Sequence, residues 1–199
     1  ILFKNTPKKT YKSRNAKVLA IAPSYSNLLD NEMKLAQLGK FRDGFEKLKF
    51  NIEEVDLISK YFQAEVLKNG VATEQKFLEK FNDYDVIHFA MHALVDNDDS
   101  DNSKLVFTQS KDSANDNYLH SFELYNMNMN TKMAVLSACN TGYGELNSGE
   151  GVMSLARAFT YAGAQSVVMS HWRVNDKSSR DIMEYFYKHL SDGKTKDQA

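Results

Sequence analysis

The chain has 199 residues, of which 42% are hydrophobic and 26% charged, and its formal net charge is −1 at pH 7. These values are ordinary for a globular protein, and the length suffices for one domain with a sizeable buried core. Every apolar stretch is shorter than the roughly 18 residues of a membrane span. The single cysteine excludes an internal disulfide or a multi-cysteine zinc site, and it favours a reducing, cytoplasmic compartment.

The charge is unevenly distributed along the chain. Residues 1–17 carry six basic side chains and no acidic one, so the remaining residues have a net charge of −7. A basic arm can bind nucleic acid, but no aromatic stacking platform accompanies this one. We therefore predict that residues 1–16 are a linker or the end of a preceding domain and that nucleic acid is not a partner. We expect the folded domain to cover residues 17–199 and to continue beyond Ala199.

Strand-like and helix-like segments alternate along the chain, which is typical of an α/β fold with a mostly parallel sheet. In chain order, we predict a strand at 17–23, helical structure within 31–61, a strand at 63–67 and a helix with Thr73 as its N-cap. Strands at 84–91 and 104–107 and a short helix at 122–125 follow. The last part of the chain is predicted to form a strand at 133–138, a helix at 152–162, a strand at 166–172 and a last helix with Asp176 as its N-cap.

The acidic run DNDDSD at 96–101 has the composition of a calcium loop. It lacks the twelve-residue spacing that ends in a glutamate, so a solvated turn is the better interpretation. We therefore expect no metal site and no cofactor.

Two reactive side chains lie where predicted strands end. His92 follows the strand at 84–91, and Cys139 follows the strand at 133–138. In a doubly wound sheet the loops at the carboxyl ends of neighbouring strands form the ligand crevice. A nearby imidazole lowers the pKa of a thiol and accepts its proton during nucleophilic attack. The sequence after Cys139 is also rich in glycine, which permits close approach of backbone to a ligand: Gly142, Gly144, Gly149 and Gly151.

Two other interpretations stay open at this point. A lone cysteine beside apolar residues is usually an inert core residue, and a lone histidine at a strand end is usually structural. A flavodoxin-like nucleotide-binding domain predicts phosphate binding at residues 142–151. However, Asn147 interrupts the dinucleotide fingerprint, and no Gly-Lys-Ser/Thr follows, so both phosphate motifs fail.

The motifs HFAMHA (88–93), LSACNTGYG (136–144), GEGVMSLARAFTYAGAQSVV (149–168) and WRVND (172–176) together resemble the CHAT family. Its members are caspase-like cysteine peptidases, similar to separases and often fused to tetratricopeptide repeats in bacteria. The resemblance implies a three-layer caspase-like fold, a protein substrate, a metal-free mechanism, and regulatory repeats or an activator outside this segment.

The resemblance also implies roles for individual residues. His92 matches the catalytic base, Cys139 the nucleophile, and His88 a supporting histidine on the preceding strand. The backbone N–H groups of residue 93 and of Cys139 form the oxyanion hole. Residue 93 is Ala93 here, whereas the family typically has glycine; alanine keeps the N–H but disfavours positive φ.

Substrate preference is open. A carboxylate beneath the P1 side chain selects basic residues, and Asp176 is a candidate, although capping the last helix explains it equally well. Glu145 and Glu150 are weaker candidates in the loop after the nucleophile. An apolar pocket is the alternative, and its lining would be Met169, Trp172 and Val174.

We therefore expect a cysteine endopeptidase that holds its substrate as an added strand near 167–172. The alternative is a catalytically silent CHAT module that acts by binding or scaffolding. Intact His92 and Cys139 argue against that alternative, and Ala93 argues for it.

Overall fold

The computed structural model describes residues 15–25, 48–96, 99–110, 115–137, 150–170 and 174–199. A central sheet of five parallel strands has the order β2-β1-β3-β7-β8. Its strands are β1 (Lys17–Pro23), β2 (Gln63–Asn69), β3 (Val86–Phe89), β7 (Met133–Leu136) and β8 (Val167–Met169). All five overlap strands predicted from the sequence, although β3, β7 and β8 are shorter than predicted and β2 is longer.

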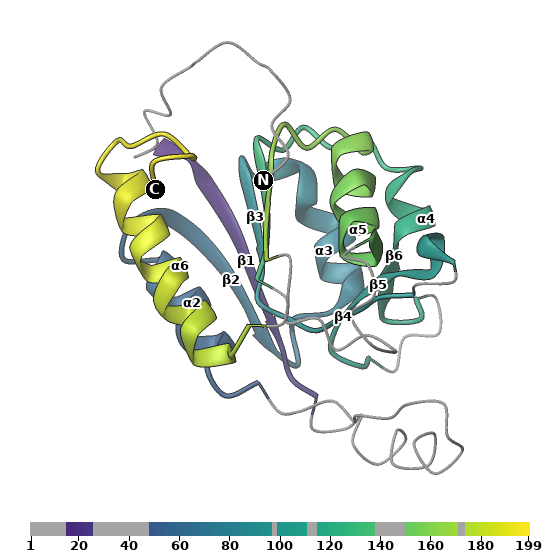
Figure 1. Cartoon of the computed structure of the whole chain (residues 1–199). Helices are drawn as coiled ribbons and strands as arrows, with labels where there is room; N and C mark the ends of the chain where they lie inside the picture. Colours follow the sequence, from purple (N-terminus) through teal and green to yellow (C-terminus); the bar gives the residue numbers. More distant parts are fainter. Residues whose placement is uncertain (1–14, 26–47, 97–98, 111–114, 138–149, 171–173) are drawn as a thin grey trace.

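Helices cover both faces of this sheet. Helices α2 (Asn51–Ile58) and α6 (Asp176–Ser191) pack on one face, and α3 (Glu74–Lys80) and α5 (Glu150–Tyr161) pack on the other (Figure 1). The predicted three-layer α/β fold with a parallel central sheet is therefore confirmed.

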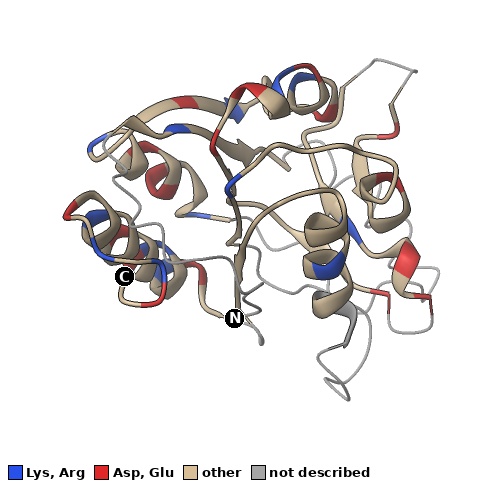
Figure 2. Ribbon diagram, turned by 90° about the horizontal axis from the view of Figure 1, so that it is seen from above, with Lys and Arg blue, Asp and Glu red and all other residues tan. Residues whose placement is uncertain are grey.

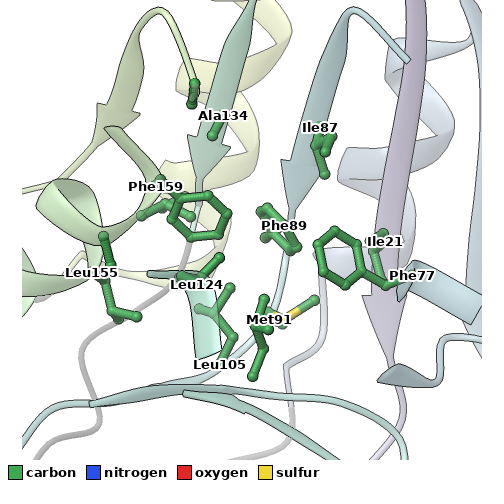
Figure 3. Packing of buried hydrophobic residues seen from close by; sticks show 14 of the residues in the cluster. Ile21, Phe77, Ile87, Phe89, Met91, Leu105, Leu124, Ala134, Leu155 and Phe159 are labelled. Atoms are coloured by element: carbon green, nitrogen blue, oxygen red, sulfur yellow. The ribbon is translucent and has the colours of Figure 1, made fainter. Parts of the chain in front are cut away.

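Successive side chains of a strand point to opposite faces of the sheet, and this alternation produces two separate hydrophobic cores. Leu19 and Ile21 of β1 face α3 and α5, whereas Val18 and Ala20 face α2 and α6. Both sets are fully buried, because an inner strand of a three-layer fold is covered on both faces. Figure 3 shows the first core, in which aromatic rings from the helices meet apolar side chains of the strands.

The strand order reverses direction between β1 and β3. From β1 the chain crosses to β2 on one side, and it then returns to β3 on the other side. At such a switch point the connections leave the sheet in opposite directions and open a crevice outside the carboxyl ends. The ends of β1 and β3 are therefore the place where this fold is expected to bind a ligand.

A second, antiparallel sheet follows β3 directly. Its order is β4-β5-β6, with β4 (Ala93–Leu94), β5 (Lys104–Val106) and β6 (Tyr118–His120). Only the middle strand was predicted, because its residues belong to the apolar run at 105–107, whereas β4 and β6 are short and carry no comparable strand pattern of their own. The short helix α4 (Ser121–Leu124) then leads to β7, and two 3₁₀ turns, η2 (Phe81–Asp83) and η3 (Ser100–Asn102), complete the described elements.

The two predicted helix caps have different outcomes. Thr73 caps α3 as predicted, since its side chain accepts a hydrogen bond from the N–H of Lys76. The prediction for α6 is wrong by one residue: Asn175 is the N-cap and accepts from the N–H of Lys177. Asp176 is instead the first helical residue, where its carboxylate still favours the helix dipole.

Acidic and basic residues are interspersed along the described helices of both outer layers, as the colours of the ribbon in Figure 2 show. All but one of the six basic side chains of residues 1–17 lie within residues 1–14. These residues are outside the described part of the chain. Its interpretation as a linker stays a prediction.

Candidate active site

The chain leaves β3 and β7 at neighbouring points. These strands are adjacent and parallel, and Phe89 is the register partner of Leu136. His92 follows Phe89 by three residues, and Cys139 follows Leu136 by three residues. Cys139 itself lies outside the described residues.

The backbone of His92 is held on both sides. Its N–H donates to the hydroxyl of Tyr25, at 2.9 Å from nitrogen to oxygen, and its carbonyl accepts from the N–H of Val106 at 3.0 Å. The tyrosine ring also contacts the imidazole, with 4.6 Å between ring centroids. His92 is only 1% exposed, so its side chain is almost fully buried.

Ala93 is the first residue of β4 and pairs with Leu105 of β5. Because the neighbouring residue His92 accepts a ladder hydrogen bond from β5, the alternation of an antiparallel ladder directs the N–H of Ala93 away from β5. Among the described non-glycine residues, positive φ occurs only at Asn69 and Asn117. Ala93 therefore has a backbone conformation that alanine adopts without strain.

His88 has different surroundings from His92. Its Nε2 lies 2.8 Å from Glu54 Oε1 on α2, and its Nδ1 lies 3.0 Å from the Tyr187 hydroxyl on α6. All three side chains are buried. These contacts join the central sheet to the α2/α6 layer, so His88 supports packing on that face. Its role as a supporting histidine for His92 stays a prediction.

The Asp176 carboxylate binds backbone from a distant part of the chain. Its Oδ2 accepts from the N–H of Lys49 at 2.6 Å and from the N–H of Phe50 at 2.9 Å. Phe50 is the N-cap residue of α2. Asp176 therefore joins the start of α6 to the start of α2, and this carboxylate oxygen is already engaged.

We predict that Asp176→Ala destabilises the fold without altering P1 preference. Loss of a capping carboxylate costs about 1 kcal/mol, which lowers Tm by about 2–4 °C in a domain of this size. The matched control is Asp181→Ala on the same helix, whose side chain is 45% exposed and whose loss should change Tm little. If Asp176 selects a basic P1 residue, the variant instead loses that preference at unchanged Tm.

The remaining predicted site residues lie outside the described part of the chain. They are Cys139, Glu145 and Trp172. Glu150 begins α5, and Met169 ends β8. Met169 and Val174 are half-buried, so an apolar pocket at this position stays a prediction.

The sequence matches the profile of one protein family, the CHAT domain, over residues 6–199. The chain belongs to the CHAT family. This family is related to the caspase-like cysteine peptidases, and the five-stranded parallel sheet is consistent with the caspase-like fold.

Two curated relatives contain the same kind of segment. They are tetratricopeptide repeat protein 28 of Mus musculus and of Homo sapiens, 25% and 26% identical to this CHAT domain over 172 residues. Each alignment covers 71% of this chain but only 7% of the relative. Among solved structures, a flavodoxin of Streptococcus pneumoniae TIGR4 has a TM-score of 0.45 at 15% identity, covering 89% of this chain and 99% of that one; similarity at this level carries no argument about function.

Two residues near the site were missed by the sequence analysis of this CHAT domain. Tyr25 contacts His92, as described above. Asn51, which only interrupts an apolar pattern in the sequence, is 4% exposed, and its Nδ2 donates to the carbonyls of Pro23 and Ala90. A buried amide at the first residue of a helix is a signal for such a bridge, because it needs hydrogen-bond partners.

Within the described ranges, His, Cys, Asp and Glu do not gather into a group of three that could hold a metal ion. None of the helices in those same ranges combines the length and hydropathy that a membrane crossing requires.

Proposed function

We propose that this CHAT domain is a cysteine endopeptidase in which Cys139 is the nucleophile and His92 the general base. The observation that carries the proposal is the register of β3 and β7, which pairs Phe89 with Leu136. In the sequence His92 and Cys139 each follow one of these partners by three residues, which supports the proposal that they meet at neighbouring strand ends. The family's relation to caspase-like peptidases supports the same assignment.

Acylation follows from this pair. His92 accepts the thiol proton, and the Cys139 thiolate attacks the peptide carbonyl to form a C–S bond. The C–N bond then breaks, and the imidazolium gives its proton to the leaving amine. In deacylation His92 takes a proton from water, the resulting hydroxide attacks the thioester, and the C–S bond breaks to return the thiolate.

The oxyanion that forms in each step needs hydrogen-bond donors. The N–H of Ala93 is the first proposed donor, and the alternation of the β4–β5 ladder directs this group away from β5. The N–H of Cys139 is the second donor. One such donor typically contributes about 10²–10³ in turnover.

The substrate binds as an added strand along β8. Within the described residues β8 pairs only with β7 and forms one edge of the central sheet. Val168 and Met169 are half-buried at this edge. An extended peptide gains backbone hydrogen bonds on such an edge, and its alternate side chains enter pockets that set specificity.

Activity is under the control of a region outside this segment. The 1% exposure of His92 supports a latent domain in which a partner must open the site. The curated relatives are tetratricopeptide repeat proteins that are far longer than this chain, so repeats of this kind are the proposed regulatory partner.

The burial of the His92 side chain also favours the second candidate function, a catalytically silent CHAT module that binds or scaffolds.

The experiment that tests the proposal is cleavage of a peptide library, with and without candidate repeat-containing partners. We expect cleavage in at least one condition and complete loss after treatment with iodoacetamide. Because the chain has one cysteine, alkylation of the domain can act only at Cys139. Cleavage that survives full alkylation contradicts the nucleophile assignment. A library left uncut in every condition, together with partner binding, favours the silent module.

A further inference from the structure

The ladder between β4 and β5 is incomplete at the position of His92. Ala93 pairs with Leu105 and Leu94 with Lys104, so one more step in this register brings His92 opposite Val106. The N–H of Val106 does donate to the carbonyl of His92 at 3.0 Å. In an antiparallel ladder such a pair normally exchanges two hydrogen bonds, the second from the N–H of His92 to the carbonyl of Val106.

The Tyr25 hydroxyl takes the place of that second bond. It accepts from the N–H of His92 at 2.9 Å and donates to the carbonyl of Val106 at 2.9 Å. One oxygen between the two groups holds them farther apart than a direct ladder bond of about 2.9 Å would. The bridge therefore satisfies both backbone groups while it keeps the start of β4 displaced from β5.

The ring of Tyr25 also fixes the imidazole. The two ring centroids are 4.6 Å apart with an interplanar angle of 49°, and Tyr25 is 6% exposed. Burial raises the pKa of the Tyr25 hydroxyl far above its usual range, so it stays protonated and keeps both its donor and its acceptor role. The face of a tyrosine ring favours a neighbouring cation, which suits an imidazole that becomes protonated during catalysis.

Tyr25 is itself held in place from its own side of the sheet. It lies two residues after the end of β1. The N–H of the preceding residue, Ser24, donates to the Thr108 hydroxyl at 2.9 Å, and that hydroxyl donates to the carbonyl of Asn69 at the end of β2. The phenol is thus anchored by the carboxyl ends of β1 and β2, and through its hydroxyl it fixes the segment that follows β3.

We propose that Tyr25 is a positioning residue that sets the backbone and ring orientation of His92 by replacing a ladder hydrogen bond. The catalytic part of this inference rests on the proposed function, in which His92 is the base. Without the hydroxyl, His92 either leaves two buried backbone groups unpaired or moves toward Val106 to form the direct bond. Either change displaces the imidazole, and a displacement of about 1 Å can cost about 100-fold in rate.

The test compares Tyr25→Phe with Tyr187→Phe. Each variant removes one buried tyrosine hydroxyl and keeps the aromatic ring. The Tyr25 hydroxyl is hydrogen-bonded to the backbone N–H of His92, and the Tyr187 hydroxyl is hydrogen-bonded to the imidazole of His88. Tyr187 is 1% exposed and lies on α6, on the other side of the central sheet from α3 and α5. It therefore matches Tyr25 in burial and chemistry but not in position. The Tm of both variants is measured, and all comparisons are made well below it.

Two NMR readouts need no enzymatic activity. We expect amide hydrogen exchange at His92 to be at least about tenfold faster in Tyr25→Phe than in the unaltered chain, because its amide loses a buried acceptor. We expect the imidazole C–H resonances of His92 to shift in the same variant. Tyr187→Phe should change neither. If Tyr25→Phe leaves both readouts as they are in Tyr187→Phe, the bridge does not position His92 and the inference is overturned.

The kinetic readout separates this inference from the proposed function. In the active, partner-bound enzyme we expect Tyr25→Phe to lower kcat by about 10-fold to 100-fold with KM nearly unchanged. If His92 moves but kcat does not change, Tyr25 has no role in catalysis and the inference fails. If the unaltered chain cleaves nothing in the presence of every candidate partner, the proposed function fails, whereas the NMR readouts still decide whether Tyr25 positions His92.

Discussion

His92→Ala should lower kcat/KM by about 10²–10⁴-fold, and Cys139→Ala should reduce cleavage to background. The base and the nucleophile act in the same steps, so removing either one disables the pair. We therefore expect the double variant to be no slower than Cys139→Ala alone. Such non-additivity distinguishes a dyad from two residues that contribute independently. The measurement is single-turnover cleavage of the best library peptide.

The control for this prediction is His189→Ala. His189 lies in the last turn of α6, at the opposite end of that helix from Asp176. This variant should keep kcat/KM within about twofold of the value for the unaltered chain. If His92→Ala retains most of the activity, or if the effects of the two single variants multiply in the double variant, His92 is not the base for Cys139.

Glu54→Ala should cause the largest loss of stability. Glu54 on α2 is 2% exposed, and His88 on β3 is 0% exposed. The distance between Glu54 Oε1 and His88 Nε2 is 2.8 Å. Removing one partner of such a buried pair typically costs about 3–5 kcal/mol. For a domain of this size the Tm should fall by about 6–20 °C. Thermal unfolding followed by circular dichroism measures the effect.

Glu53→Ala is the matched control, since it removes a carboxylate from the same first turn of α2. The Glu53 side chain is 59% exposed, and its Oε2 lies 3.8 Å from Nε of Arg180. Its loss should change stability by no more than about 0.5 kcal/mol. Equal losses of Tm in the two variants would show that helix charge, and not the buried pair with His88, stabilises this layer.

The sequence predicts the parts of the fold whose signal is local. The strands β1, β3 and β7 are short apolar runs buried on both faces, and that burial requires a continuous apolar pattern. The same runs place His92 and Cys139 just after strands. Which strands are neighbours is not a local property, however, so the pairing of Phe89 with Leu136 required the structure.

The residues that support the candidate site are harder to predict because their partners are distant in the chain. Tyr25 and His92 are 67 positions apart, and Asp176 and Lys49 are 127 positions apart. Asp176 illustrates the difficulty: a carboxylate at a helix start predicts a cap for its own helix. In the structure its carboxylate binds the backbone N–H groups of Lys49 and Phe50 just before α2, and the neighbouring Asn175 caps α6.

The central claim is that the thiol of Cys139 and the imidazole of His92 are neighbours, and the pH dependence of Cys139 alkylation tests it most directly. The sole cysteine of the chain makes the modified site unambiguous. We predict that the rate of modification by iodoacetamide has its midpoint well below pH 8.5 and that His92→Ala returns it to about 8.5, the value of an ordinary thiol. A midpoint near 8.5 in both proteins would contradict the account.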